Sequence, residues 1–237
     1  KLPLVSVSSA ENIRKTTDGR VFITGKNGLY EFQKDSANQF SVTPVYVDEK
    51  CSYFAGLTQL QDWMFFVCVN QSGFSAKTGR YENGGRLLAF SLLSSETVSV
   101  LDLHDYQFPN GLDTLPQENA VLIADEDFFG HGGLNKLTVT FDDAGVPVAG
   151  DYAHHWLGKA QGVNSVNGVR VVNDTLYVTD LGTVKSIHLD DTKNPELALS
   201  VYHAPTILDD LDATCDGLIV ADFVQGRLIF IPYDGST

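Results

Sequence analysis

The chain has 237 residues, of which 43% are hydrophobic and 19% are charged, an ordinary balance for a globular protein. Its formal net charge is −14, which would repel a polyphosphate backbone, so nucleic acid is not an expected partner. No run approaches 18 apolar residues, and no membrane-spanning helix is predicted.

The three cysteines are Cys51, Cys68 and Cys215, and they lack the CxxC spacing of a zinc site. Cys51 and Cys68 could pair in an oxidising compartment, but the pattern favours buried free thiols on strands. No signal peptide is visible, and a leader could already be missing before Lys1. The compartment therefore stays unknown: a soluble protein is expected, and a secreted or periplasmic location is one option.

A short unit recurs along the chain, and it opens each time with a polar or small residue followed by a second small or polar residue and an aliphatic one. These openings begin at residues 11, 55, 110, 167 and 209, so they are 42 to 57 residues apart. Such intervals are typical of propeller blades with four strands each. The opening triplets are Glu11-Asn12-Ile13, Ala55-Gly56-Leu57, Asn110-Gly111-Leu112, Asn167-Gly168-Val169 and Asp209-Asp210-Leu211.

Each opening leads into a short strand, a tight turn and a second strand rich in β-branched and aromatic residues. Asp, Asn and Gly dominate the turns, as in Thr17-Asp18-Gly19, because they favour local side-chain hydrogen bonds and positive φ. The second strands, such as Val121 to Ala124, are expected to be buried on both faces. A third strand follows in every unit.

Four of the five units also show a fourth, outer strand, predicted at residues 42–47, 98–103, 152–156 and 199–203. The fifth unit shows none before Thr237. Either residues 2–7 supply the missing strand and close a five-bladed ring, or a sixth blade exists beyond this chain. No linker or break in composition is visible, so residues 1–237 are predicted to form a single all-β propeller domain.

The residues that open the units are the candidates for chemistry. In a propeller the innermost strands all start at one face, so Glu11, Ala55, Asn110, Asn167 and Asp209 are predicted to converge on the axis. Four of these five offer oxygen ligands, which suit a hard cation such as Ca²⁺. A turn-capping role is the alternative for each residue taken alone.

These motifs, in this order, resemble the calcium-dependent six-bladed propellers of the SMP-30/gluconolactonase and paraoxonase group. The resemblance implies a catalytic Ca²⁺ held by Glu11, Asn110, Asn167 and Asp209, with Asp210 as a further candidate ligand. It also implies a small lactone or ester as substrate, and a last blade that is missing or incomplete here. A paraoxonase-type His pair is not expected, because Ala55 and Gln71 occupy the matching positions.

The resulting hypothesis is a calcium-dependent hydrolase of lactones or esters. Ca²⁺ would polarise the substrate carbonyl, and Asp209 would orient or deprotonate the attacking water. His131 is a second candidate base, since it lies between glycines in a turn expected on the same face as the metal. The loop from Asn70 to Gly85 is predicted to cover the channel mouth.

Two further functions remain open from the sequence. A non-catalytic propeller of the NHL type could bind a partner across one face, although it would not need oxygen donors on the axis. A strictosidine-synthase-like enzyme would share the fold without requiring this set of metal ligands. The sequence shows neither a GxSxG elbow nor a phosphate-binding glycine-rich loop.

Overall fold

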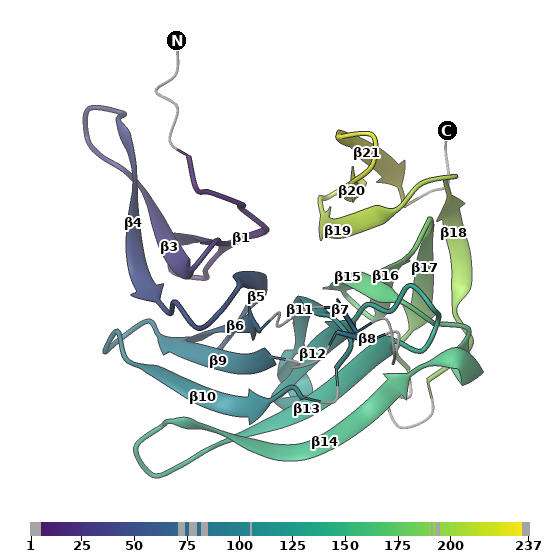
Figure 1. Cartoon of the computed structure of the whole chain (residues 1–237), viewed down its shortest axis with the longest axis horizontal. Coiled ribbons are helices and arrows are strands. Elements are labelled where there is room, and N and C mark those ends of the chain that lie inside the picture. Colours follow the sequence, from purple (N-terminus) through teal and green to yellow (C-terminus); the bar gives the residue numbers. More distant parts are fainter. Residues whose placement is uncertain are drawn as a thin grey trace. The chain divides into compact units, whose positions relative to one another are not determined.

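The computed structural model describes residues 6–70, 74–75, 80–81, 85–104, 106–190, 192 and 195–233. Among these residues the fold is all-β, with four four-stranded sheets, one three-stranded sheet and a two-stranded ribbon. The strands follow one another through the sheets in chain order, as the colours of Figure 1 show. The five sheets are the blades of the β-propeller that the repeat predicts.

The blade strands have the following bounds. The first two sheets contain β1 (Asn12–Lys15), β2 (Val21–Gly25), β3 (Gly28–Lys34) and β4 (Phe40–Val47), then β5 (Tyr53–Leu60), β6 (Trp63–Val69), β9 (Gly85–Ser91) and β10 (Thr97–Asp102). The third and fourth contain β11 (Pro109–Leu115), β12 (Ala120–Asp125), β13 (Gly133–Phe141) and β14 (Pro147–Leu157), then β15 (Val166–Val172), β16 (Thr175–Asp180), β17 (Thr183–His188) and β18 (Leu199–His203). The fifth contains β19 (Leu208–Ala213), β20 (Gly217–Asp222) and β21 (Arg227–Pro232).

The remaining elements are short. The ribbon pairs β7 (Phe74–Ser75) with β8 (Arg80–Tyr81), and two helical turns span Pro116–Glu118 and Lys159–Gln161. Within the described part of the chain, no helix has the length and apolar character that crossing a membrane requires. The predicted lid falls on residues 70–85, most of which lie outside the described residues.

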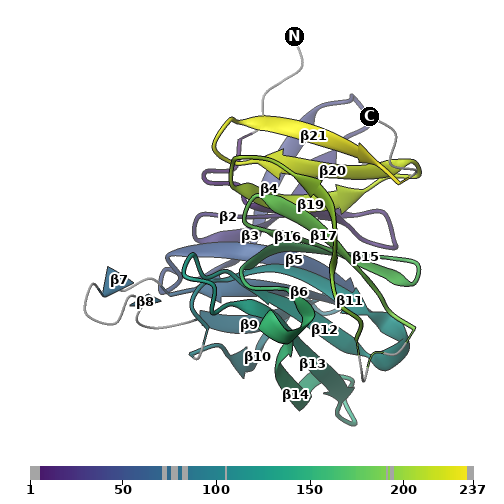
Figure 2. The same ribbon diagram turned by 90° about the vertical axis from the view of Figure 1, so that its right-hand side faces the viewer.

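The structure consists of two compact units. The first unit comprises residues 1–109 and 141–148, and the second comprises residues 110–140 and 149–237. In the first unit β5 packs against β1, β2 and β3, and in the second β15 packs against β12 and β19. Figure 2 shows the last of these contacts, with the sheet of β19–β21 stacked on the sheet of β15–β17. The single domain over residues 1–237 stays a prediction.

Burial is complete in the second strands of the second and third sheets. All seven residues of β6 and all six of β12 are buried, and β12 packs against β15 within the second unit. Alternation would be expected only for a sheet with one face in water. The core of the second unit joins the third and fourth sheets through residues such as Leu122, Val169 and Val178.

The fifth sheet is less buried on one of its faces. Val220 and Ile231 face the core, whereas Leu228 and Phe230 on the other face of β21 are 73% and 52% exposed. The sheet has three described strands, as the sequence predicts for the fifth repeat. A sixth blade is not confirmed, since the described residues form five blade sheets.

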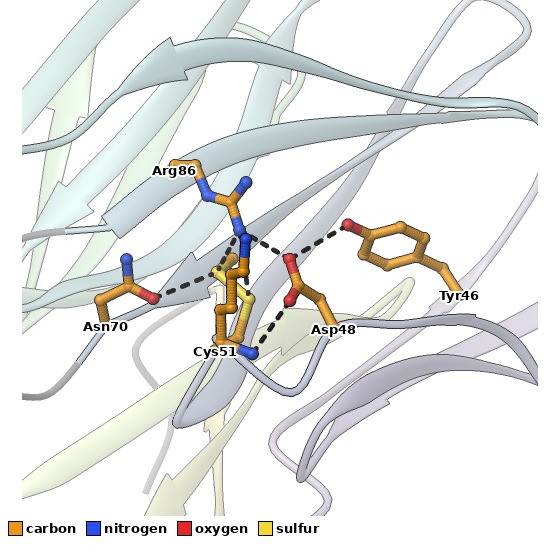
Figure 3. Close-up of a disulfide and its surroundings, with 7 residues drawn as sticks. Tyr46, Asp48, Cys51, Asn70 and Arg86 are labelled. Carbon is orange, nitrogen blue, oxygen red and sulfur yellow. Dashed lines mark hydrogen bonds and ion pairs between the residues drawn. A yellow bond between two sulfur atoms is a disulfide. The ribbon is translucent and has the colours of Figure 1, made fainter.

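The first unit contains a disulfide between Cys51 and Cys68, so the expectation of two free thiols is wrong. Cys51 precedes β5 and Cys68 lies on β6, and the pairing of these strands brings the two residues together. Arg86 lies beside the sulfurs, and its Nη2 forms an ion pair of 2.7 Å with Asp48 Oδ2 (Figure 3). Asp48 also accepts a hydrogen bond from the backbone N–H of Lys50, which holds the loop before Cys51. Cys215 is a free, exposed cysteine.

The disulfide should contribute substantially to the stability of the first unit. It closes a loop between residues 17 positions apart, and such a loop is associated with about 3 kcal/mol. We expect the double variant Cys51→Ser, Cys68→Ser to lose about that much free energy of unfolding in urea titrations. The control Cys215→Ser should leave the unfolding midpoint in place, and equal midpoints for both variants would contradict the prediction.

Candidate functional site

The opening residues of the repeat lie at β-bulges in three of the inner strands. In β15, Asn167 and Gly168 together lie opposite a single residue of β16, Thr179. On either side of this bulge the pairing is regular, with Val166 opposite Asp180 and Val169 opposite Val178. In β19, Asp209 and Asp210 together face Ala221, and β5 has the same two-against-one arrangement at Ala55 and Gly56. Bulges often redirect side chains next to functional sites, which explains why a pair of residues marks each opening.

Threonine side chains at the ends of the second strands bind the backbone of two openings. Thr179 Oγ1 accepts a hydrogen bond of 2.7 Å from the Gly168 N–H, which the bulge removes from the regular strand pairing. In the first sheet, Thr24 Oγ1 accepts a hydrogen bond of 3.1 Å from the Asn12 N–H. The openings are therefore fixed in position rather than frayed strand ends.

Four polar side chains meet in the second unit, where β11, β15 and β19 begin. Asn167 Nδ2 donates a hydrogen bond of 3.1 Å to Glu126 Oε2, and Asn167 also hydrogen-bonds to Asp209. The Asn110 side chain hydrogen-bonds to the same Glu126 carboxylate. The structure thus brings together three of the predicted ligands, Asn110, Asn167 and Asp209, and adds Glu126 to them.

The two carboxylates of this cluster are held in an unfavourable environment. The pKa of Glu126 is raised to about 7, mainly by burial and to a smaller extent by the nearby charge of Asp209. The hydrogen bond from Asn167 acts in the opposite direction and lowers this pKa. Burial also raises the pKa of Asp209, and hydrogen bonds from Asn167 and the Asp210 backbone oppose this shift. A cation at this point would favour the ionised form of both groups.

Asp210 follows Asp209 in the same bulge, and its carboxyl accepts a hydrogen bond of 2.8 Å from the Leu211 N–H. Burial raises its pKa to about 7, with smaller contributions from the charges of Asp209, Asp212 and Asp113. Its main chain lies against β15, since a Cβ on Gly168 would come within 2.7 Å of the Asp210 Cα. Its assignment as a further ligand stays a prediction.

A buried arginine lies farther along the same strands. Arg170 on β15 is 4% exposed, and its guanidinium lies between Asp113 of β11 and Asp212 of β19, at 3.6 and 3.1 Å. Asp113 Oδ2 also accepts a hydrogen bond of 2.7 Å from the Val171 N–H. These bonds tie together the three inner strands that carry Asn110, Asn167 and Asp209.

The turn that carries Glu126 is anchored to the start of β15. The backbone N–H of Asp127 donates to Ser165 Oγ at 3.1 Å, and Ser165 lies two residues before Asn167. The Ser165 N–H in turn donates to Asp180 Oδ1 at 3.0 Å, at the end of β16. Asp180, whose other oxygen accepts from Lys185 Nζ, has the structural role of closing this turn.

The remaining predicted residues lie elsewhere. Glu11 belongs to the first unit, where it is exposed directly before β1 and its N–H donates to the Thr24 carbonyl. Its share in a metal site stays a prediction. His131 is exposed in the loop between β12 and β13, and its role as a base is likewise a prediction.

Sequence reasoning missed Glu126, although it singled out the turn that contains it. The signal was its place directly after Asp125, the last residue of a fully buried strand. Glu126 itself remains buried, with 4% of its surface exposed. His131 lies farther along the loop, where the chain has already reached solvent.

The donor set of this cluster fits a hard cation. The Asn167 Oδ1 atom is buried and has no hydrogen-bond partner, and an unsatisfied buried carbonyl oxygen is a suitable ligand for Ca²⁺. In the described residues, no group of three or more His, Cys, Asp or Glu side chains is arranged to hold a metal. The cluster instead combines two carboxylates with two amides, a mixture that Ca²⁺ accepts and that transition metals do not prefer.

The geometry of the cluster should depend on a glycine at the start of β11. A Cβ on Gly111 would lie 2.5 Å from the Asn167 carbonyl oxygen, so Gly111→Ala should push β11 away from β15. We expect this variant to lose about 1–3 kcal/mol in urea unfolding and to lower the affinity for Ca²⁺ measured by calorimetry.

A second glycine provides the matched control for this variant. Gly162 has φ +78° and open space where a Cβ would lie, so Gly162→Ala should cost about 1 kcal/mol from the backbone alone. Its Ca²⁺ affinity should stay that of the parent protein. Equal effects of both substitutions on Ca²⁺ binding would contradict a role for close packing at Gly111.

The raised pKa of Glu126 predicts how stability depends on pH when divalent cations are removed. The folded pKa of about 7 exceeds the ordinary value of 4.5, so the folded protein holds this proton more tightly than the unfolded chain. In EGTA, the resulting stabilisation should be complete below about pH 4.5 and be lost as the pH rises through 7, by up to about 1.4 kcal/mol per pH unit. Glu126→Gln should flatten the profile, whereas Glu49→Gln, at an exposed position, should not.

Several proteins of known structure share this fold. No family profile matches the sequence, and no curated protein matches it. Among solved structures, a gluconolactonase from Xanthomonas campestris is 13% identical, with 90% of this chain and 69% of that chain covered and a TM-score of 0.62. A luciferin-regenerating enzyme is 12% identical, with 93% of this chain and 72% of that chain covered and a TM-score of 0.66. A virginiamycin B lyase from Staphylococcus aureus is 13% identical, with 96% of this chain and 68% of that chain covered and a TM-score of 0.56. The fold of this chain is thus that of the gluconolactonase-like propellers, which confirms the resemblance found in the sequence.

Proposed function

We propose that this protein is a hydrolase of lactones or esters that uses Ca²⁺. The observation that carries the proposal is the cluster of Glu126, Asp209, Asn110 and Asn167, in which two buried carboxylates with raised pKa values meet two amides. A binding scaffold has no need to bury carboxylates in this way, since each costs free energy unless it is paired. Gluconolactonases with the same fold support a lactone substrate.

Three residues of the cluster, Asn110, Asn167 and Asp209, would hold the cation, with Glu126 contributing a second carboxylate. Glu11 and Asp210 are the further candidates from the repeat. When bound, Ca²⁺ supplies Lewis acidity that polarises an acyl carbonyl and stabilises negative charge on its oxygen. The neutral amides orient the carboxylates, because Asn167 donates to both of them.

Asp209 is the proposed base. Its carboxylate lies at the start of β19 and would take a proton from the attacking water. The water oxygen forms a bond to the acyl carbon, the bond from that carbon to the alkoxy oxygen breaks, and the proton passes to the leaving oxygen. His131, in the exposed part of the β12–β13 loop, is the alternative base.

Binding and catalysis can be tested with single substitutions. We expect Ca²⁺ to raise the melting temperature of the parent protein, with a stabilisation of about 2.7 kcal/mol when free Ca²⁺ is a hundredfold above its Kd. Asp209→Asn should abolish hydrolysis of δ-valerolactone or an aryl acetate, and Asn167→Leu and Glu11→Ala should weaken Ca²⁺ binding. Asp143→Asn, at an exposed turn of the first unit, is the control that should retain both properties.

The outcomes separate the two parts of the proposal. If EGTA changes neither melting temperature nor activity, the proposal that the protein uses Ca²⁺ is wrong. If Ca²⁺ binds but no lactone or aryl ester is hydrolysed, the site is a metal site without this activity. Loss of hydrolysis in His131→Gln, with activity retained in Asp209→Asn, would transfer the role of base to His131.

A further inference from the structure

A pocket of about 500 Å³ lies in the first unit, where three hairpin turns meet. Its walls come from the β5–β6 turn, the β9–β10 turn and the β13–β14 turn, whose residues 141–148 belong to this unit. Glu126 and Asp209 belong to the second unit, so the pocket is separate from their cluster. Volumes of about 300–1,000 Å³ are typical of small-molecule sites.

Hydrogen bonds join the three turns to one another. The Leu92 N–H donates at 2.9 Å to the Asp62 carbonyl, which links the β9–β10 turn to the β5–β6 turn. The indole Nε1 of Trp63 donates at 3.1 Å to the Gly145 carbonyl, which links the β13–β14 turn to the same point. The pocket is therefore preformed, and a ligand would not have to order its walls.

Each of the two longer turns is also closed by a side chain of its own. In the β13–β14 turn, Asp142 Oδ1 accepts hydrogen bonds of 2.9 Å from the Ala144 and Val146 N–H groups. In the β9–β10 turn, Ser91 Oγ accepts one of 3.0 Å from the Ser94 N–H. The polar groups that shape the walls are thus used inside the turns, so they are not the groups that a ligand would engage.

The lining combines apolar side chains with two carboxylates. Trp63 is 7% exposed, and Phe141 and Val146 are half-buried beside it. The Trp63 N–H is already bonded to the backbone, so this residue offers a ligand only its ring. Among the described lining residues, Asp62 and Glu96 carry the charges, and both are exposed. The pocket thus presents hydrocarbon surface with negative charge at its exposed side.

The described part of the chain supplies no cation that neutralises this charge. None of its ion pairs involves Asp62 or Glu96. A nearby guanidinium, that of Arg20, donates from Nη1 to the Leu92 carbonyl at 3.2 Å. Its other nitrogens bind the Glu31 carboxylate at 2.8 and 3.1 Å, so its charge is already paired. The two carboxylates of the lining are therefore available to a positively charged ligand.

This combination selects a cation that carries a hydrocarbon body. An ammonium group is attracted by carboxylates and by the face of an aromatic ring, whereas its hydrocarbon body gains from burial against apolar side chains. A metal ion would gain nothing from the apolar lining, and the described residues hold no group of three or more His, Cys, Asp or Glu arranged for one. We propose that the pocket binds an organic ammonium ion, a primary amine with an alkyl or aryl body, independently of the proposed hydrolase site.

The test compares three probes with the same alkyl body and different charge. Hexylamine, hexanol and hexanoate are titrated by calorimetry into the full chain at neutral pH, with Ca²⁺ present to occupy the Glu126–Asp209 cluster. We expect hexylamine to bind about tenfold more tightly than hexanol, and hexanoate not to bind. Equal affinities for the amine and the alcohol, or no binding of the amine in the millimolar range, would overturn the proposal.

Substitutions locate the bound amine. Asp62→Asn and Glu96→Gln should each weaken hexylamine binding by about threefold and leave that of hexanol unchanged. Glu49→Gln removes the same charge at an exposed position outside the lining and should keep the parent affinity. Ala144→Arg, which adds a guanidinium to the lining, should abolish binding of the amine. If Asp209→Asn weakens hexylamine binding while the first two substitutions together do not, the amine binds at the other cluster and the proposal is wrong.

Discussion

The two-against-one pairing at the start of the inner strands is the constraint on which the candidate site depends. A regular strand sends successive side chains to opposite faces, and a bulge changes the direction of the side chains beside it. The bulges at Asn167–Gly168 and Asp209–Asp210 break that alternation where β15 and β19 begin. Glycine at position 168 also admits the Asp210 main chain, which a Cβ would block. The site is thus built from backbone irregularities that are held by defined hydrogen bonds.

The electrostatics of the cluster follow from this placement. Bringing inner strands together buries Glu126 and Asp209 near each other, and burial raises the pKa of both. Amide donors from Asn110 and Asn167 offset part of the cost, and they leave the Asn167 carbonyl oxygen unsatisfied. Elsewhere on the same strands, Asp113 and Asp212 form ion pairs with the guanidinium of Arg170. This contrast is the physical argument behind the proposal that Glu126 and Asp209 bind a cation.

The fold leaves the chemistry open, because the same blade arrangement occurs in a gluconolactonase and in a virginiamycin B lyase. What distinguishes one protein from another is the set of side chains at the strand starts and on the neighbouring turns. In this chain the strand starts and the β12–β13 turn beside them carry oxygen donors.

The sequence by itself determined the blades, because turn residues such as Asp18-Gly19 and apolar runs such as Val121 to Ala124 act locally. It also determined three cluster residues, since Asn110, Asn167 and Asp209 occupy equivalent repeat positions. Only the tertiary structure decided the rest. Glu126 is not at a repeat position and enters the cluster through the Asp127–Ser165 contact between sheets. The Cys51–Cys68 disulfide likewise depends on how β5 pairs with β6, because whether two thiols come within bonding distance is settled by strand register and not by their spacing along the chain.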